Sequence, residues 1–296
     1  MYKYKACSLT IQSELSFPKL ENSAREPDVS IRIVDRDIIA SIKQNNCLDC
    51  FIGDVAEVGT FCIIEGKEIL VIPAPNVDLS FLRTIIMGPI ICILLRQRGL
   101  LVLHASSFAV NGEAVAFMGD SGWGKSTLVE SFYCKGYEIL TDDVMIVENK
   151  PQYSMVLPGF AQIKLWPDAA AASGHKDNSL PTVHSQTRKL SHKINRGFAS
   201  EPQQLKKIYL LSYGDSNKIS ALQPQEAFVH LIRHTRAVNL LTDSKFINSH
   251  FYQCSNLIKN VAVYRLQRKR CLTEIPQIID LVEKDLEIFA NVPSSK

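Results

Sequence analysis

Apolar and polar residues alternate over much of the first 78 residues. Four short apolar runs are separated by polar turns, and they read CSLTIQSEL, VSIRIV, FCIIEG and EILVIPA. An alternation with a period of two residues is typical of strands that bury one face. The pattern therefore predicts a small, mostly β N-terminal region over residues 1–78.

A long apolar stretch follows this region. From Phe81 to Arg98 the chain reads FLRTIIMGPIICILLRQR, and Gly99 comes directly after it. The spacing favours a helix that ends at Gly99, with Pro89 as a place where the helix would break. The uninterrupted apolar run covers only 85–95, which is shorter than the roughly 20 residues that span a bilayer.

The next part of the chain has the densest pattern. Two apolar runs flank Asn111 and Gly112, and an Asn-Gly pair between such runs is a strong hairpin signal. The second run leads into a glycine-rich loop, MGDSGWGKS. After it, KSTLVESFYCK has helical spacing and stops at Gly136, and YEILTDDVMIVE returns as a strand. This order of strand, loop, helix and strand predicts a mixed α/β (α+β) domain, which we extend over 79–296.

Beyond this unit the pattern is looser. IKLW predicts a short strand, and a short helix begins near Pro167 and Asp168. Residues 174–205 are polar, basic and poor in large apolar residues, so we expect a flexible loop there. A strand KKIYLLSY, a helix from about Gln225, a strand VAVYRL and a helix TEIPQIIDLVEKDLEIF complete the prediction.

Composition limits the classes of function. The 296 residues are 46% hydrophobic and 21% charged with a net charge of +3, so the overall balance favours neither nucleic acid nor a membrane as a partner. The opening MYKYKACSLTIQSELSF lacks the apolar core of a signal peptide, which favours a cytoplasmic location. The eight cysteines are then expected to be thiols, and the C-x-x-C pair Cys47 and Cys50 lacks the further ligands of a zinc or redox motif.

The glycine-rich loop carries the strongest chemical signal in the sequence. Its residues fit the pattern G-x-x-x-x-G-K-[ST], in which backbone N–H groups surround phosphate oxygens. Lys125 would reach the β- and γ-phosphates, and the hydroxyl of Ser126 would bind Mg²⁺. We therefore predict a nucleotide site formed by Gly119, Asp120, Ser121, Gly122, Trp123, Gly124, Lys125, Ser126 and Thr127.

Two adjacent aspartates, Asp142 and Asp143, stand in the returning strand. A magnesium nucleotide needs a carboxylate to hold the metal, and a hydroxyl acceptor needs a base. Adjacent residues on a strand face opposite ways, so either the strand bends and both reach the site, or one is catalytic and the other structural. An isolated pair would be a solvated turn, but the preceding loop favours catalysis. Candidate metal ligands are therefore Ser126, Asp142 and Asp143, and Lys125 joins the two aspartates as a candidate catalytic residue.

Two further residues have two interpretations each. His104 lies one strand upstream, in LHASS, where a lone histidine is usually a core residue. At the mouth of the loop, His104 would instead orient an aspartate or touch the phosphates. Trp123 would either shield the γ-phosphate from water or pack against a neighbouring helix.

Three stretches, LHASSFAVNG, MGDSGWGKST and KGYEILTDDV, together resemble the kinase domain of the HPr kinase/phosphorylase superfamily. The short spacing from the loop to the aspartate pair is the most specific feature of the resemblance. It implies the phosphoenolpyruvate-carboxykinase-like nucleotide fold rather than that of a typical P-loop NTPase. The opening YKACSLTIQSELSFP and the stretch LPGFAQIKLWPDA resemble a finer branch, the HPr-kinase-related serine kinases, some of which act on lasso-peptide precursors.

The resemblance implies roles for the candidate residues. Asp142 and Asp143 would divide Mg²⁺ binding and activation of a serine hydroxyl, with assistance from His104, and the sequence does not assign the two roles. The long signature loop of bifunctional HPr kinases is not found, so the sequence does not decide whether the reverse phosphorylase activity exists. A basic segment would stabilise the transferring phosphoryl group, dock an acidic peptide tail or form a solvated loop, and it comprises Arg188, Lys189, Lys193 and Arg196.

We therefore expect an ATP- and Mg²⁺-dependent kinase that phosphorylates a serine or threonine of a peptide or small protein, such as a ribosomal peptide precursor. Two alternatives stay open. One is a kinase of HPr or of a small metabolite in carbon regulation, and the other is a nucleotide-binding protein that transfers nothing. The expected partner is a peptide or small-protein substrate, and a homo-oligomer is implied only by what is common in the family.

Overall fold

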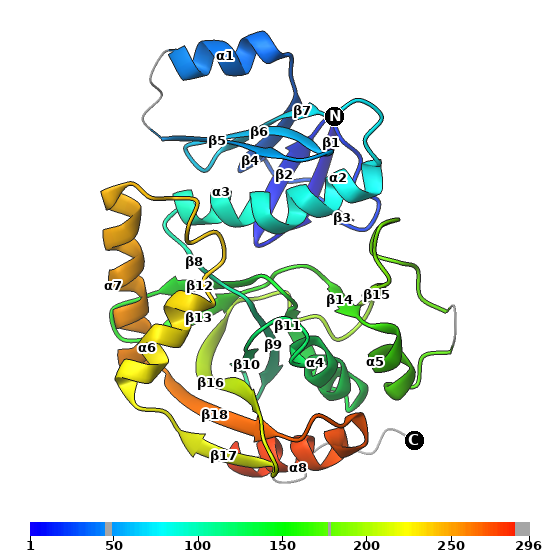
Figure 1. Cartoon of the computed structure of the whole chain (residues 1–296), viewed down its shortest axis with the longest axis vertical. Coiled ribbons are helices and arrows are strands. Elements are labelled where there is room, and N and C mark those ends of the chain that lie inside the picture. The colour runs from blue at the N-terminus through cyan, green and yellow to red at the C-terminus, as the bar shows by residue number, and fades with distance from the viewer. Residues whose placement is uncertain (45–48, 177–178, 288–296) are drawn as a thin grey trace.

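The computed structural model of the protein describes residues 1–44, 49–176 and 179–287 (Figure 1). Cys47 lies outside the described residues, so the structure does not place the C-x-x-C pair. Among the described residues, the N-terminal strands form a seven-stranded sheet in the order β3-β1-β2-β4-β7-β6-β5. Their bounds are β1 Tyr2–Ala6, β2 Leu9–Ser13, β3 Glu21–Asn22, β4 Val29–Ile33, β5 Cys50–Val55, β6 Gly59–Ile64 and β7 Glu68–Pro73.

Helical segments pack against the N-terminal sheet. The helix α1 (Arg36–Gln44) packs on it through Ile39, and the sequence pattern did not predict this helix. A continuous helical segment of 19 residues, Leu79–Gln97, also packs on the sheet. It consists of α2 (Leu79–Ile85), the π-helical turn η1 (Ile86–Ile90) and α3 (Ile91–Gln97).

The helical segment Leu79–Gln97 differs from its prediction in two ways. The chain does not break at Pro89, because η1 is a wide π-helical turn that accommodates a residue without an N–H group. By length and composition alone the segment is also apolar enough to cross a membrane, whereas the sequence prediction considered only 85–95. Half of the segment is buried inside the protein, and buried core helices of soluble proteins pass the same test.

A second sheet has nine strands among the described residues. Seven of them run in the order β11-β9-β10-β16-β13-β12-β8, and β18 pairs with both β16 and β17. The sheet is mixed, because β10–β16 and β16–β18 are parallel while β9–β10 is antiparallel. The bounds are β8 Leu101–Leu103, β9 Ala105–Val110, β10 Glu113–Met118, β11 Glu138–Thr141, β12 Met145–Asn149, β13 Ser154–Leu157, β16 Gln203–Tyr213, β17 Lys218–Ala221 and β18 Ala262–Arg268.

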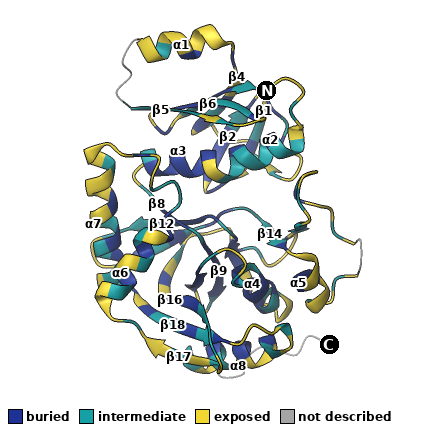
Figure 2. Cartoon of the chain, in the orientation of Figure 1, coloured by how far each residue is buried: buried dark blue, intermediate teal, exposed yellow. Residues whose placement is uncertain are grey.

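Helices cover both faces of this second sheet (Figure 1). On one face Val115 and Phe117 of β10 pack with α4 and α8, and on the other Ala114, Ala116 and Met118 pack with α6 and α7. A strand buried on both faces reads as an unbroken apolar run, which is why its sequence is AVAFM. Figure 2 shows the centre of the sheet as buried. The helices are α4 Lys125–Cys134, α5 Pro167–Ala172, α6 Pro224–Arg233, α7 Ser244–Asn260, η2 Leu272–Glu274 and α8 Ile275–Asp285.

The fold is the mixed α/β class that the sequence predicts. The predicted hairpin is confirmed, because β9 and β10 pair with Val110 opposite Glu113, so Asn111 and Gly112 form the turn. The division of the chain into two regions at residue 78 stays a prediction. One apolar cluster contains buried residues of the first sheet, of α3, and of β12 in the second sheet, such as Ile146.

Two predicted strands are divided in the structure. The first strand of the hairpin is interrupted at His104, so that β8 pairs with β12 while β9 pairs with β10 and β11. The strand after α4 is interrupted between β11 and β12, at the two aspartates. The flexible loop predicted at 174–205 is wrong over β15 (Leu190–Lys193), which pairs with β14 (Gln162–Leu165).

An aromatic cluster fills the face of the second sheet that α4 covers. Its rings are in contact with one another, and they belong to Phe108, Phe117, Phe132, Tyr137 and Tyr209.

We expect Phe132→Ala to lower the free energy of unfolding by about 3–5 kcal/mol, because Phe132 is fully buried and its loss leaves a cavity. Urea denaturation measures this change. Tyr252→Ala, at a side chain that is 73% exposed, should change the free energy of unfolding by less than about 0.5 kcal/mol. Equal losses of stability in the two variants would contradict the burial of Phe132 in the cluster.

Candidate functional site

The glycine-rich loop connects β10 to α4, and its backbone requires glycine. Gly122 and Gly124 have φ angles of +81° and +91°, in the left-handed region that disfavours side chains. At Gly124 a Cβ atom would also collide with the guanidinium of Arg268. Gly124 is the residue that precedes the first turn of α4, so the loop delivers the helix N-terminus, with its free N–H groups, to the site.

Lys125 folds back over the loop that precedes it. Its Nζ donates to the carbonyl oxygens of Gly119 at 2.8 Å and Asp120 at 3.0 Å. The side chain is buried, and burial lowers the pKa of Lys125 from 10.5 to about 8. A buried ammonium beside carbonyl dipoles lacks a full negative partner, and phosphate oxygens would supply one.

Asp142 lies where β11 ends, and its carboxylate joins three elements. Oδ1 accepts from Ser106 Oγ of β9 at 2.6 Å and from Ser126 Oγ of α4 at 2.8 Å. Oδ2 accepts from the backbone N–H of Lys164 in β14 at 2.8 Å. Burial, and then the charge of Asp143, raises the pKa of Asp142 above its ordinary value despite these hydrogen bonds.

Asp143 follows with a φ of +72°, and it faces a different set of groups. Its Oδ1 lies 3.1 Å from His104 Nε2 and 3.2 Å from Arg236 Nη2, and its Oδ2 lies 3.5 Å from Lys164 Nζ. Burial pushes the pKa of Asp143 upward, but the hydrogen bond from His104 and the charges of Lys164 and Arg236 hold it well below its usual range. The chain therefore bends at the pair, and both side chains reach the site.

His104 occupies the interruption between β8 and β9. Its backbone N–H donates to the carbonyl of His234 at 2.7 Å, and its ring contacts Asp143. Burial lowers the pKa of His104 below 6.5, although the hydrogen bond to Asp143 acts in the opposite direction. Of the two interpretations made from the sequence, this geometry matches the one in which His104 orients an aspartate.

A polar cavity of about 270 Å³ opens beside the loop. The predicted residues that line it are Ser121, Gly122, Gly124, Lys125, Ser126, Thr127, His104 and Asp143. The carbonyl of Trp123 accepts from Arg268 Nη2 at 3.0 Å, and its ring lies beside that of Tyr213 in β16, so the ring packs on a strand rather than on the neighbouring helix that was expected. Of the basic segment, Lys189 also lines the cavity, whereas Arg188, Lys193 and Arg196 are exposed.

Three basic residues of the site were not predicted. Lys164 lies in β14, Arg268 ends β18, and Arg236 follows α6 in a segment whose N–H donates to Val102 of β8. Arg268 is buried, and its Nε and Nη1 have no hydrogen-bond partner among the described residues. Each residue comes from a distant segment. The strand-like IKLW gave a local signal for a strand at Lys164, but nothing near Arg236 or Arg268 in the sequence pointed to the loop.

These groups fit a magnesium nucleotide. The unpartnered guanidinium atoms of Arg268 and the buried ammonium of Lys125 face a polar cavity at a helix N-terminus, which suits phosphate oxygens. The oxygen atoms of Ser126, Asp142 and Asp143 are the donors that Mg²⁺ prefers. Of the residues predicted to bind nucleotide or metal, Gly119, Asp120, Trp123 and Asp142 do not line the polar cavity, and Asp142 reaches it only through its hydrogen bond with Ser126.

A second cavity, of about 390 Å³, lies on the other side of the aspartate pair. Asp142 and Lys164 line it, and Lys164 is shared with the polar cavity. Its remaining walls come from the loop after β2, from α2 and η1, and from residues 160–162 and 182–185. This second cavity is mainly apolar, with Phe17 and Met87 among its walls.

Comparisons with known proteins found likenesses among solved structures but none at the level of sequence. No family model matches the chain, and no curated protein matches it. A solved structure of the HPr(Ser) kinase/phosphatase from Coxiella burnetii is similar to it at 11% sequence identity and a TM-score of 0.34, over 63% of this chain and 97% of that chain.

The lowered pKa of Lys125 can be tested without any activity assay. With a pKa of about 8, half of the Lys125 amine is neutral at pH 8, so its reaction with an acylating reagent should rise through that pH. Free N-acetyl-lysine amide should rise near pH 10.4 instead. Peptide mass spectrometry of the protein after brief acylation measures the rate. Adding ATP with Mg²⁺ should slow the reaction, and a rate that followed the free lysine control would contradict the buried position of Lys125.

Proposed function

We propose that the protein is an ATP- and Mg²⁺-dependent kinase that transfers the γ-phosphate to a serine or threonine hydroxyl of a peptide or small protein. The observation that carries the proposal is the position of Asp142. Its carboxylate is hydrogen-bonded to Ser126 of the phosphate-binding loop and also lines the apolar cavity on the other side. One group therefore lies between a site for a phosphate donor and a separate site for an acceptor.

The donor side holds and neutralises phosphates. Backbone N–H groups at the start of α4, with Lys125 and Arg268, would bind the phosphate oxygens and hold the negative charge that passes to ADP. Bound Mg²⁺ would neutralise further phosphate charge. Ser126 Oγ would bind the metal through its lone pairs while its proton remains donated to Asp142, as in the hydrogen bond observed.

The two aspartates have environments that suit different roles. Asp142 has a raised pKa and lines the apolar cavity, and among the described residues its Oδ2 accepts from the backbone N–H of Lys164. A carboxylate oxygen accepts two hydrogen bonds, so Oδ2 can take an acceptor hydroxyl as well. Asp142 would then remove the hydroxyl proton as the oxygen attacks the γ-phosphorus.

Asp143 would serve the donor side. It lines the polar cavity, and His104, Lys164 and Arg236 keep it ionised. An ionised carboxylate is the form that binds Mg²⁺. His104 would hold this carboxylate in position, and we therefore assign Asp143 to the metal and His104 to positioning.

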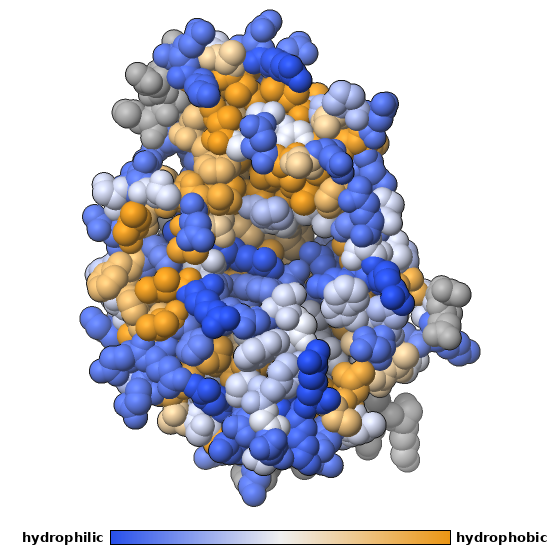
Figure 3. Space-filling model, viewed as in Figure 1, coloured by the Kyte–Doolittle hydropathy of each residue, from blue (hydrophilic) through white to orange (hydrophobic). Residues whose placement is uncertain are grey.

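The apolar cavity supports a peptide as acceptor rather than a small polar metabolite. Its walls offer contacts for apolar side chains that flank a serine, and Lys19 and Arg83 add positive charge beside them. Figure 3 shows apolar residues gathered around the N-terminal sheet and α2–α3, whereas hydrophilic residues dominate the face below.

Substitution of the two aspartates should separate their roles. With radiolabelled ATP and an array of serine-centred peptides, Asp142→Asn is expected to lower kcat by about 10²–10⁴-fold, the range that a general base contributes. ATP binding to Asp142→Asn, measured by calorimetry, should stay close to that of the unaltered protein. Asp143→Asn should weaken Mg²⁺-dependent ATP binding instead, and Lys125→Ala should abolish transfer. If no peptide is labelled while ATP still binds, the peptide-kinase proposal is wrong, and a kinase of another acceptor or a nucleotide binder without transfer replaces it.

The acceptor cavity can be filled without touching the phosphate site. Met87→Trp should raise the KM for the best peptide on the array, because the larger side chain occupies the cavity, while leaving the affinity for ATP unchanged. Leu79→Trp is a matched control, since Leu79 lies on the same helical segment but is exposed. Peptide kinetics that responded equally to both variants would exclude this cavity as the acceptor site.

A further inference from the structure

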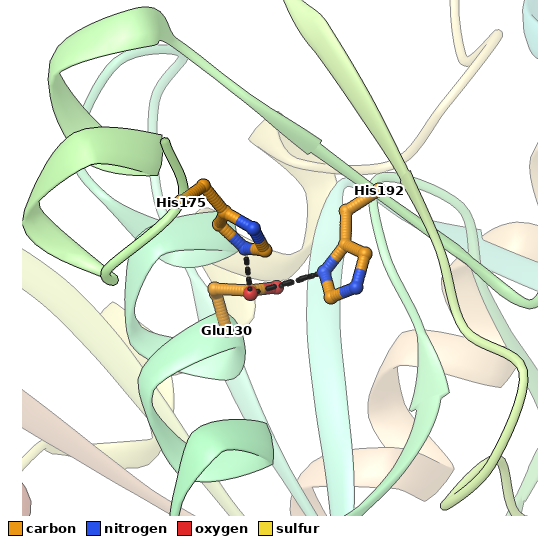
Figure 4. Close-up of side chains that lie close together, drawn as sticks. All are labelled: Glu130, His175 and His192. Carbon is orange, nitrogen blue, oxygen red and sulfur yellow. Dashed lines mark hydrogen bonds and ion pairs between the residues drawn. The ribbon is translucent and has the colours of Figure 1, made fainter. Parts of the chain in front are cut away.

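Three side chains meet on the flank of α4, away from the phosphate loop. Glu130 comes from the middle of α4, His175 follows α5, and His192 lies in β15. Figure 4 shows both imidazole rings directed at the carboxylate from opposite sides. His175 Nε2 lies 2.7 Å from Glu130 Oε1, and His192 Nδ1 lies 3.0 Å from both oxygens. The sequence analysis gave none of these residues a role.

The charge of Glu130 has little compensation from the protein. Its side chain is fully buried, and in the part of the chain that the structure describes its ion pairs are with the two histidines only. The three ligand atoms, one from each side chain, all lie within 4.8 Å of one another. A buried charge is normally paired with an opposite charge or bound to a metal ion. A neutral imidazole does not supply such a charge, so a metal ion would complete the compensation of the carboxylate.

We propose that Glu130, His175 and His192 bind a divalent transition-metal ion of the zinc class. Two imidazole nitrogens and one carboxylate oxygen form a set that suits Zn²⁺. Ligand atoms about 2.0–2.1 Å from zinc lie roughly 3.3 Å from one another in a tetrahedron. The two distances from Glu130 to the histidines, 2.7 and 3.0 Å, would widen slightly, and the ligand atoms of the two histidines already lie within 4.8 Å of each other. The Cys134 thiol, 3.9 Å from Glu130 Oε1, or a water molecule would take the fourth position.

The metal would attach the chain around 175–192 to the helix that begins at the phosphate loop. β15 pairs with β14, with Ser191 opposite Lys164, and Lys189 just before β15 lines the polar cavity. A metal held by α4 and β15 would therefore fix one wall of that cavity. This structural role is distinct from that of Mg²⁺, whose predicted ligands at the loop are all oxygen atoms. The metal proposal is independent of the proposed function, because metal content is measured without phosphotransfer.

Metal binding by the full chain tests the proposal. The protein is stripped with a chelator, then titrated with Zn²⁺ against a chromophoric competitor and with Co²⁺ followed by visible absorption. We expect one equivalent of either ion, with the intense absorption of four-coordinate Co²⁺. His175→Ala, His192→Ala and Glu130→Gln should each weaken binding by about 100-fold or more, since even indirect partners of a metal contribute about 10–100-fold. His184→Ala should bind like the unaltered protein.

His184 is a matched control because it lies in the same segment but packs against Phe81, with ring centroids 4.7 Å apart. Circular dichroism would identify a variant that fails to fold, and His192→Gln then replaces it as a milder change. If the unaltered protein binds no more Zn²⁺ or Co²⁺ than the double variant His175→Ala/His192→Ala, the cluster is a hydrogen-bonded clamp and the proposal is wrong. Loss of the metal should also speed proteolysis between 179 and 189.

Discussion

The arrangement of the site depends on the buried carboxylate of Asp142. A charge removed from water is costly unless hydrogen bonds replace its hydration. Asp142 receives them from Ser106, from Ser126 and from the backbone of Lys164, which belong to β9, α4 and β14. The same bonds that stabilise the charge therefore hold α4, the central sheet and one wall of the apolar cavity in a fixed relation.

Two adjacent aspartates act together only because the strand is interrupted between β11 and β12. In a regular strand their side chains would point to opposite faces, but Asp143 adopts a φ of +72°, a conformation that aspartate tolerates better than most residues. The environments then push the two pKa values apart, since Asp142 is raised by burial and Asp143 is held low by its basic neighbours. Such a difference is what two carboxylates need in order to take the roles of base and metal ligand.

The sequence predicts elements formed by neighbouring residues, but it does not predict contacts between segments that lie far apart in the chain. The hairpin at Asn111 and Gly112, the glycine-rich loop and the helix after it could be predicted, because each follows from residues close together in the chain. Arg236 and Arg268 could not, because a basic residue in a polar segment gives no sign of the loop that it will contact. The segment 174–205 was predicted to be flexible because it is poor in apolar residues, whereas polar contacts to Glu130 and pairing with β14 hold part of it.

The helix α4 shows how a short sequence serves several functions at once. Its apolar residues Leu128, Val129 and Phe132 are buried against the sheet, which fixes the helix. Ser126 and Glu130 are four residues apart, so they lie one above the other on the same side of the helix. Ser126 contacts Asp142, and Glu130, one turn further along the helix, contacts His175 and His192. A change in how the histidines hold Glu130 would therefore act on the rigid element that presents Ser126 and Lys125 to the phosphates, with no direct contact to the nucleotide site.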